Sequence, residues 1–195
     1  DLSYALPINA LNGTFNLAGG FSNTEVVEPP FDRLDILGDS VNFEFGYRQP
    51  IVLTPTTEFA LGLTASRQES KSKLLGEGFP LSPGASDRGE TRISALRFFQ
   101  DYVKRSTQSV FAMRSQFSLG LDLFDSTVNE NAPDGRFVAW RGQGQYVRLL
   151  APDTLFLVRS DLQLASRAIV PLEQIGVGGL QSVRGYRQDA LLADN

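Results

Sequence analysis

The 195-residue chain has no cysteine and no histidine. These absences exclude a disulfide framework, a thiolate nucleophile, a Cys/His zinc site and a Ser-His-Asp triad. No run of the sequence approaches the roughly 18 consecutive apolar residues of a transmembrane helix. No N-terminal signal pattern is present either, because Asp1-Leu2-Ser3-Tyr4 already has the character of a strand. The length suits one domain.

Basic residues are also fewer than acidic ones, 18 against 22, so the formal net charge is −4 at pH 7. An acidic chain is a poor candidate for binding a phosphate backbone, so no nucleic-acid partner is expected. No motif points to an enzyme, a metal site or a cofactor. Asp32, Asp35 and Asp39 fall within one predicted loop, but their spacing lacks the EF-hand pattern and indicates a solvated acidic loop.

What the chain does contain is alternation of apolar and polar residues with a period of two. From Phe111 to Phe124, one face carries Phe and Leu residues and the other carries Arg114, Gln116 and Asp122. Alternate side chains of a strand point to opposite faces, so such a segment has one apolar and one polar wall. The pattern predicts eight strands, at 1–9, 13–23, 39–50, 57–69, 91–105, 109–125, 135–150 and 154–170.

The predicted connections alternate in length. Those after residues 9, 50, 105 and 150 are short, whereas those after 23, 70, 125 and 170 are long and rich in turn formers such as Pro29-Pro30 and Pro83-Gly84. Short turns at one end and long loops at the other are typical of an outer-membrane up-and-down barrel with its long loops outside. The predicted fold is therefore all-β, an antiparallel transmembrane β-barrel.

A soluble β-barrel or sandwich that acts as a binding module shows the same periodicity, with its apolar face turned inward. Long strands and charged residues on the polar faces favour the membrane barrel. So do Tyr47, Tyr102, Trp140 and Tyr146, which are expected near strand ends at the membrane interface. A passive porin is a weaker alternative, since it leaves the C-terminal motif described next without a role.

The strongest local signal is Gly178-Gly179-Leu180-Gln181-Ser182-Val183-Arg184-Gly185-Tyr186, which follows the last predicted strand. The glycines permit a tightly folded backbone. Arg184 offers five donors and a permanent charge, which needs a carboxylate partner if it is buried. The residues assigned to a loop with a gating role are Gly178, Gly179, Ser182, Val183, Arg184, Gly185 and Tyr186.

This segment resembles the signature of the sixth extracellular loop in the Omp85/TpsB superfamily. The whole chain is similar in pattern to the barrel of ShlB/FhaC-type TpsB transporters, and the stretch from Gly179 to Asp189 is particularly similar to cyanobacterial haemolysin secretion/activation proteins. The resemblance implies a sixteen-stranded barrel of the cell outer membrane, preceded by two POTRA domains, that exports a large TpsA-like partner protein. It also implies that Arg184 pairs with an aspartate on a later strand.

On this resemblance the chain corresponds to about eight of sixteen strands, with residues 1–170 in the barrel wall and 171–195 as a lumen-folding extracellular loop. The first and last strands are then open edges, which proteins do not leave exposed. They are closed either by the rest of a larger barrel or by a second chain. Outer-membrane lipid is the expected contact of the apolar face. The alternative within the superfamily is a BamA/Toc75-like assembly or import barrel.

The polar faces of the predicted strands supply the candidate lumen. Its expected lining residues are Glu44, Arg48, Arg114, Asp122, Arg141, Arg159, Asp161 and Arg167. Four of them, Arg141, Arg159, Asp161 and Arg167, form either an ion-pair lattice that stiffens the pore or meets a passing polypeptide, or an ordinary solvated lining. Glu44, Asp122 and Asp161 are further considered as substitute partners for Arg184.

Overall fold

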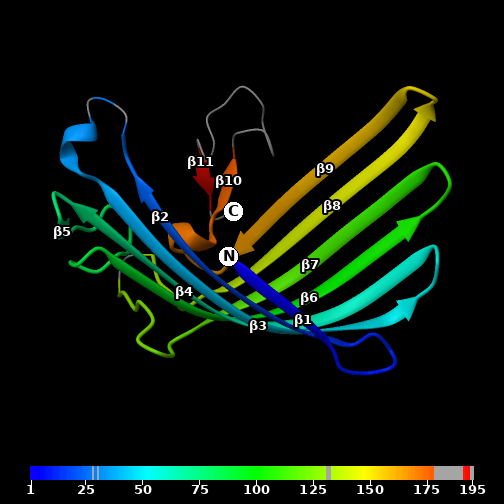
Figure 1. Ribbon diagram of the computed structural model, residues 1–195, viewed down its shortest axis with the longest axis horizontal. Helices are drawn as coiled ribbons and strands as arrows, with labels where there is room; N and C mark the ends of the chain where they lie inside the picture. Colours follow the sequence, from blue (N-terminus) through cyan, green and yellow to red (C-terminus); the bar gives the residue numbers. More distant parts are fainter. Residues whose placement is uncertain (28, 30, 131–132, 178–190, 194–195) are drawn as a thin grey trace.

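The computed structural model describes residues 1–27, 29, 31–130, 133–177 and 191–193. These residues form a curved antiparallel sheet whose long strands follow one another in chain order (Figure 1). The long strands are β1 (Leu2–Pro7), β2 (Thr14–Glu25), β3 (Leu37–Leu53), β4 (Thr57–Leu74), β6 (Glu90–Arg105), β7 (Ser109–Leu121), β8 (Val138–Ala151) and β9 (Thr154–Ala165). The eight predicted strands are thus confirmed. Among the described residues, no helix is long and apolar enough to cross a membrane.

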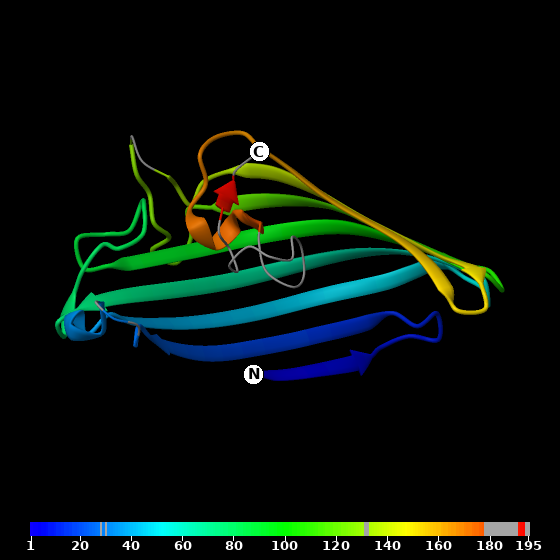
Figure 2. The same ribbon diagram turned by 90° about the horizontal axis from the view of Figure 1, so that it is seen from above.

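The smaller elements lie at the long-connection end of the sheet or over its concave face. They are the 3-10 turns η1 (Phe31–Leu34) and η2 (Pro171–Glu173), and the short strands β5 (Glu77–Gly78), β10 (Ile175–Val177) and β11 (Leu191–Ala193). β5 pairs with β4, and β10 pairs with β11 in a separate two-stranded sheet. Seen from above, η2, β10 and β11 lie over the trough of the large sheet (Figure 2).

Short polar turns fix the register of the hairpins at one end. The Asn9 side-chain oxygen accepts hydrogen bonds from the backbone N–H groups of Leu11 and Gly13, at 3.0 and 2.7 Å. Ser106 Oγ accepts from the N–H of Ser109 at 3.0 Å in the β6–β7 turn. Side chains that satisfy backbone donors stabilise such turns, and each turn sets which residues face each other on the two strands.

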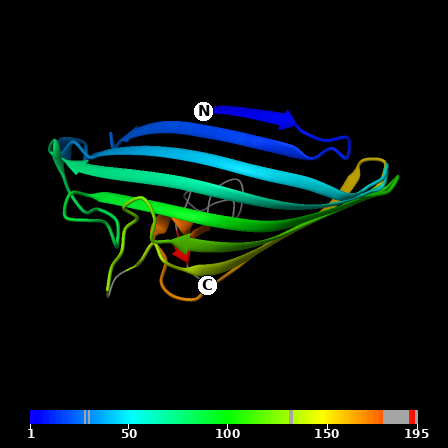
Figure 3. The ribbon, with the colours of Figure 1, turned by 90° about the horizontal axis from the view of Figure 1, so that it is seen from below.

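The register separates the two faces as the sequence predicts. On the convex face, a continuous apolar row runs through Phe15, Tyr47, Leu63, Phe98, Phe117, Trp140 and Leu164, which are cross-strand neighbours. Phe117 and Leu164 are 48% and 61% exposed. Figure 3 shows the strands of this sheet side by side from below. An apolar face that points away from the trough fits a membrane barrel and not a soluble one.

Two predicted strands end four or five residues earlier than expected. β7 ends at Leu121 and not at residue 125, because Phe124 and Asp125 adopt φ values of 55° and 56°, a left-handed conformation that breaks the strand. β9 ends at Ala165 and not at 170, because Ile169 and Val170 turn into a buried cluster and Pro171 lacks a ladder donor. Arg167 and Asp122 therefore lie just outside their strands.

The aromatic residues expected near strand ends divide into two groups. Tyr102 packs against Phe111, and Tyr146 against Phe156, close to the short turns. Tyr47 lies opposite Phe15, the second residue of β2, and its hydroxyl accepts a hydrogen bond from Asn9 in the β1–β2 turn. Trp140 lies opposite Leu164, near the other end of β8 and β9. Tyr47, Tyr102 and Tyr146 thus lie near the short turns and Trp140 near the long connections, which are the positions of interfacial aromatics.

The compact core lies where the chain leaves β9. Ile93, Ala95, Phe137, Ala139, Ile169 and Val170 form one buried cluster. Ile169 and Val170 are both 0% exposed, and the backbones of Asp134 and Ile169 form an isolated parallel β-bridge. This cluster fixes the direction in which the chain turns from the wall into the trough.

Candidate functional site: the concave wall

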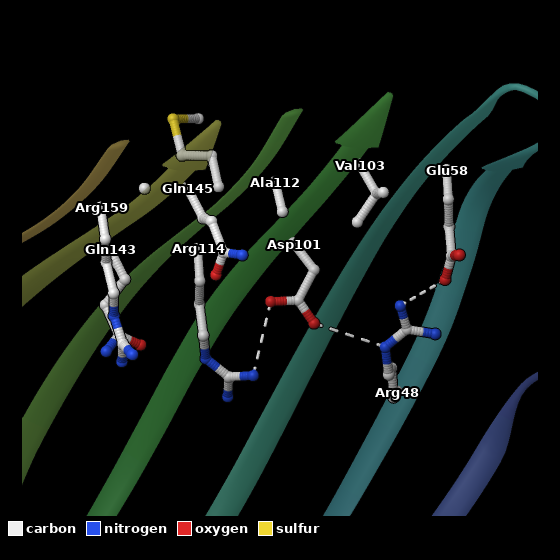
Figure 4. Close-up of a pocket in the computed structure, with 11 residues that line it drawn as sticks. Arg48, Glu58, Asp101, Val103, Ala112, Arg114, Gln143, Gln145 and Arg159 are labelled. Carbon is white, nitrogen blue, oxygen red and sulfur yellow. Dashed lines mark hydrogen bonds and ion pairs between the residues drawn. The ribbon is translucent and has the colours of Figure 1, made fainter. Parts of the chain in front are cut away.

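A lattice of ion pairs covers the part of the concave face near the short turns (Figure 4). Arg48 on β3 binds Glu58 at 2.5 Å and Asp101 on β6 at 3.4 Å. Asp101 in turn meets Arg114 on β7 at 3.4 Å. These side chains border a hollow of about 380 Å³. The lattice ties four strands, β3, β4, β6 and β7, together across the wall.

A second group continues this lattice onto β8 and β9. Asp161 accepts a hydrogen bond from Gln143 at 2.6 Å and lies 3.6 Å from Arg141 and 3.5 Å from Arg159. Both arginines keep more than a third of their side-chain surface exposed. The pairs are therefore partly solvated, and each alone contributes little to stability. Their arrangement gives the wall alternating charges that a polar chain can contact.

Phe99 places an aromatic ring on this otherwise polar face. The Arg114 guanidinium stacks over the Phe99 ring, with its carbon 4.0 Å from the ring centre. Gly62, the cross-strand neighbour of Phe99, leaves the space that the ring occupies. The Phe98-Phe99 pair makes the alternation of the strand irregular because Phe98 lies on the convex face and Phe99 on the concave face.

Replacing Gly62 by valine is expected to displace the Phe99 ring and with it Arg114. Forcing extra carbon atoms into a filled space costs about 1–3 kcal/mol. The expected result is a lower thermal unfolding temperature of the purified protein. Gly19→Ala is the matched control, because the nearest atoms to its added carbon lie 3.7 Å away. Equal unfolding temperatures for the two variants would contradict this packing role.

A buried ion pair clamps the returning chain to the wall. Glu173 in η2 pairs with Arg97 on β6, and the two side chains are only 10% and 11% exposed. Arg97 also donates to Ser66 on β4. Gln163 on β9 donates to the Glu173 backbone oxygen at 3.1 Å. Three strands of the wall thus hold η2 inside the trough.

The surroundings of Glu173 set its protonation. Burial raises the pKa of the Glu173 carboxyl above its usual value, and the Arg97 guanidinium opposes this increase. The charge of Glu44 raises the pKa further, and the charge of Arg141 lowers it. The net direction is upward. The clamp therefore joins a permanent cation to a carboxyl that gains a proton more readily than in water.

A second buried carboxylate holds the β7–β8 connection. Asp134 is 1% exposed and binds Arg136 at 3.1 Å and Arg167 at 3.2 Å. Burial by itself raises the pKa of Asp134, but the hydrogen bonds from the backbone and side chain of Arg136, together with the charge of Arg167, outweigh it and hold the pKa below its usual range. Asp134 thus links the connection to the chain that follows β9.

The structure brings most of the predicted lining residues to one face. Those that lie on the concave wall are Glu44, Arg48, Arg114, Arg141, Arg159 and Asp161. Arg167 joins Asp134 outside the lattice, and Asp122 lies exposed beyond the end of β7. The motif from Gly178 to Tyr186 lies outside the described residues, so its gating role and the partner of Arg184 stay predictions.

Sequence reasoning did not single out Glu58, Arg97, Asp101, Asp134 or Glu173. For Asp101 a signal was present, since the tight β6–β7 turn sets it opposite Arg114. Arg97 and Glu173 are 76 residues apart in the chain, and no local pattern connects them.

An open, curved sheet with an apolar convex face, a charged concave face and a segment clamped inside defines part of the wall of an outer-membrane transport barrel. The chain belongs to the haemolysin secretion/activation protein family ShlB/FhaC/HecB, whose model matches residues 1–195. Members of this family are outer-membrane β-barrel transporters, and the chain is accordingly an outer-membrane protein.

Solved structures that share this fold include two CdiB proteins. CdiB from Escherichia coli superposes with a TM-score of 0.80 at 15% sequence identity, covering 95% of this chain and 34% of that one. CdiB from Acinetobacter baumannii gives a TM-score of 0.68 at 17% identity, with 97% and 33% covered. The chain thus spans about a third of the length of these structures. No curated protein sequence matches it.

Proposed function

We propose that this chain forms part of the wall of an outer-membrane pore that exports a large, unfolded TpsA-like partner protein. The observation that carries the proposal is the concave wall, where alternating charges line a hollow and a returning segment is held by Arg97 and Glu173. A polypeptide in transit is polar along its backbone and varied in its side chains. A wall of partly solvated charges of both signs offers it contacts without a deep apolar site that would trap it.

In this proposal residues 1–170 supply the wall and 171–195 the loop that folds into the lumen. Membership of the transporter family and the position of η2, β10 and β11 in the trough support this division. The motif residues Val183, Arg184, Gly185 and Tyr186 stabilise the loop in the state that supports export. No enzymatic chemistry is part of the proposal.

Arg184→Ala tests the loop's role. In cells that produce the full-length gene product with its secreted partner, the variant is expected to export several-fold less partner, because the loop loses its permanent cation. Export is measured as partner protein in the medium, and surface protease resistance checks that the barrel is inserted. Arg187→Ala is the matched control in the same loop. Unchanged export by Arg184→Ala at normal insertion would remove the role assigned to this residue.

The open edges bear on the size of the complete barrel. Within the described residues, β1 and β9 each pair with one neighbouring strand only. An eight-stranded closure would fill the lumen with side chains and leave no path for a polypeptide. We therefore propose that further strands of a longer chain close the barrel. The coverage of only about a third of the CdiB chain supports this proposal. A second chain that pairs with the open edges is the alternative.

An assembly or import barrel of the BamA/Toc75 type is the second candidate, because it shares the loop motif with Arg184. The number of POTRA domains in the full gene product distinguishes the two functions. Two domains, with a neighbouring gene for a large secreted repeat protein, support export, whereas three or more domains support assembly.

A further inference from the structure

The convex face carries an uncharged band between two charged boundaries. On β6, the outward residues Leu96, Phe98, Gln100 and Tyr102 carry no charge. They lie between Ser94 at one end, which is the cross-strand neighbour of Arg67, and Lys104 at the other end. Ten residues separate Ser94 from Lys104, which is about 33 Å along a strand. At the usual tilt of about 40° this length spans about 25 Å, the height of the apolar band of a membrane barrel. Arg67 therefore lies at the membrane boundary on the long-connection side.

An apolar hollow of about 240 Å³ lies directly below this boundary. Its lining comes from the outward residues of β3, β4, β6 and β7 and the turn after them, chiefly Phe43, Phe45, Ala65, Leu96, Leu121 and Phe124. An engineered apolar cavity of about 150 Å³ is large enough to bind benzene. The hollow is thus large enough for a segment of an acyl chain. Phe124, 79% exposed in its left-handed conformation, stands at its edge.

Arg67 joins the apolar hollow to the charged surface above it. Its stem lines the hollow, while its guanidinium donates to Glu69 at 2.7 Å and to Ser94 Oγ at 3.0 Å. It also reaches the backbone oxygen of Leu123 at 3.4 Å. Arginine commonly buries its stem in this way and keeps its charge at the polar boundary.

A second hollow of about 200 Å³ lies above the first on the same face, among Asp39, Glu69, Lys71, Glu90 and Arg92. Its ion pairs form a connected row, in which Glu69 contacts Arg67 and Arg92, and Glu90 contacts Arg92 and Lys71. Asp39 is paired with Lys73 at 3.0 Å. The hollow itself is lined by two cations, Lys71 and Arg92, and three carboxylates. Arg67 and Lys73 pair with two of these carboxylates from outside the hollow, so the whole row holds four cations and three carboxylates.

We propose that these two stacked hollows form a lipid site on the outer wall, with an acyl chain in the lower one and a phosphate headgroup against Arg67 and Arg92 in the upper one. The inference rests on the proposed embedding of the convex face in the outer membrane. The apolar hollow matches a hydrocarbon chain, and the excess cation directly above it matches a phosphate. The site would anchor the β4–β6 and β7–β8 connections to the surface of the membrane.

The test uses the full-length gene product purified in detergent, with native mass spectrometry to count bound lipids. Phosphatidylglycerol is titrated against an uncharged diacylglycerol with the same acyl chains. The wild type is expected to retain phosphatidylglycerol at least tenfold more tightly. The double variant Arg67→Gln/Arg92→Gln is expected to lose about tenfold in affinity, because charge-assisted hydrogen bonds to the phosphate are removed. Ala65→Phe fills the lower hollow and is expected to displace the lipid.

Lys104→Gln, at the opposite boundary of the apolar band, is the matched control and is expected to bind as the wild type does. Ala65→Leu is used if Ala65→Phe does not fold, as judged by heat-modifiable mobility on gels. Equal retention of the two lipids, or wild-type binding by both the arginine pair and the filled variant, would overturn the lipid site. A protein that stays soluble and monomeric without detergent would instead contradict the embedding itself.

Discussion

Replacing Arg97 by glutamine is expected to release η2 from the wall. Glu173 would remain buried without its cation, and breaking a buried pair by removing one partner costs about 3–5 kcal/mol. Within these 195 residues no cysteine competes with an introduced reporter thiol. A spin label at Leu172→Cys, an exposed position beside Glu173, should change from a restricted to a mobile spectrum.

The double variant Arg97→Gln/Glu173→Gln removes both charges and is expected to recover part of the docking. Arg105→Gln on the same strand is the control, because its side chain is 49% exposed and lies 4.0 Å from Glu58. A label that stays restricted in Arg97→Gln would contradict the clamp. A double-variant effect equal to the sum of the effects of Arg97→Gln and Glu173→Gln would show that the two charges act independently.

The same pair predicts a pH dependence. The pKa of Glu173 is raised in the folded protein, so its contribution to stability is present below the unfolded value of 4.5 and is lost as the pH rises through the higher folded value. Docking of η2 is therefore expected to be tighter at acidic pH. The defect of Arg97→Gln should shrink there as well, because a protonated Glu173 no longer needs a cation. Glu173→Gln should remove the dependence.

Replacing Asp134 by alanine is the second change with a large expected effect. It removes the charged hydrogen bonds to Arg136 and Arg167, each worth about 1.5–3 kcal/mol. A backbone β-bridge places Asp134 beside Ile169, so the space left by its side chain should also loosen the cluster around Ile93 and Phe137. The expected result is a destabilisation of about 3 kcal/mol in thermal or urea unfolding of the detergent-solubilised protein.

Asp153→Asn, in the exposed β8–β9 turn, is the control for this change and should unfold as the wild type does. The lowered pKa of Asp134 determines the pH range over which its side chain stabilises the folded protein. Its stabilisation is present above the unfolded value of 3.8 and is lost as the pH falls through the lower folded value. Wild-type stability should thus decline in strong acid more than that of Asp134→Ala. Parallel acid curves for the two proteins would contradict the assignment.

The strand pattern was predictable because its cause is local. A strand that contacts lipid on one side and water on the other must alternate, so the faces of Phe117 and Arg114 follow from the order of residues alone. The hairpin turns at Asn9 and Ser106 are likewise encoded by neighbouring residues. Strand ends were less accurate, because Val170 turns inward to pack against distant residues such as Ile93 and Phe137, and Phe124 adopts a left-handed backbone conformation.

The candidate site was predictable in composition but not in pairing. The sequence placed Arg48, Arg114, Arg141, Arg159 and Asp161 on the polar face. It did not show that Arg48 reaches Asp101, since that contact depends on the registers of two intervening strand pairs. A shift of one residue in either register would turn one partner to the other face.

The sequence by itself determined that this protein is an antiparallel wall with one lipid-facing and one polar side, and its loop motif indicated the family. Only the tertiary structure decided how the wall is used. It brought Glu173 back across the trough to Arg97, buried Asp134 between two arginines, and stacked a charged hollow above an apolar one beside Arg67. Alternation is set by the geometry of a single strand, whereas these sites depend on the curvature and register of several strands together.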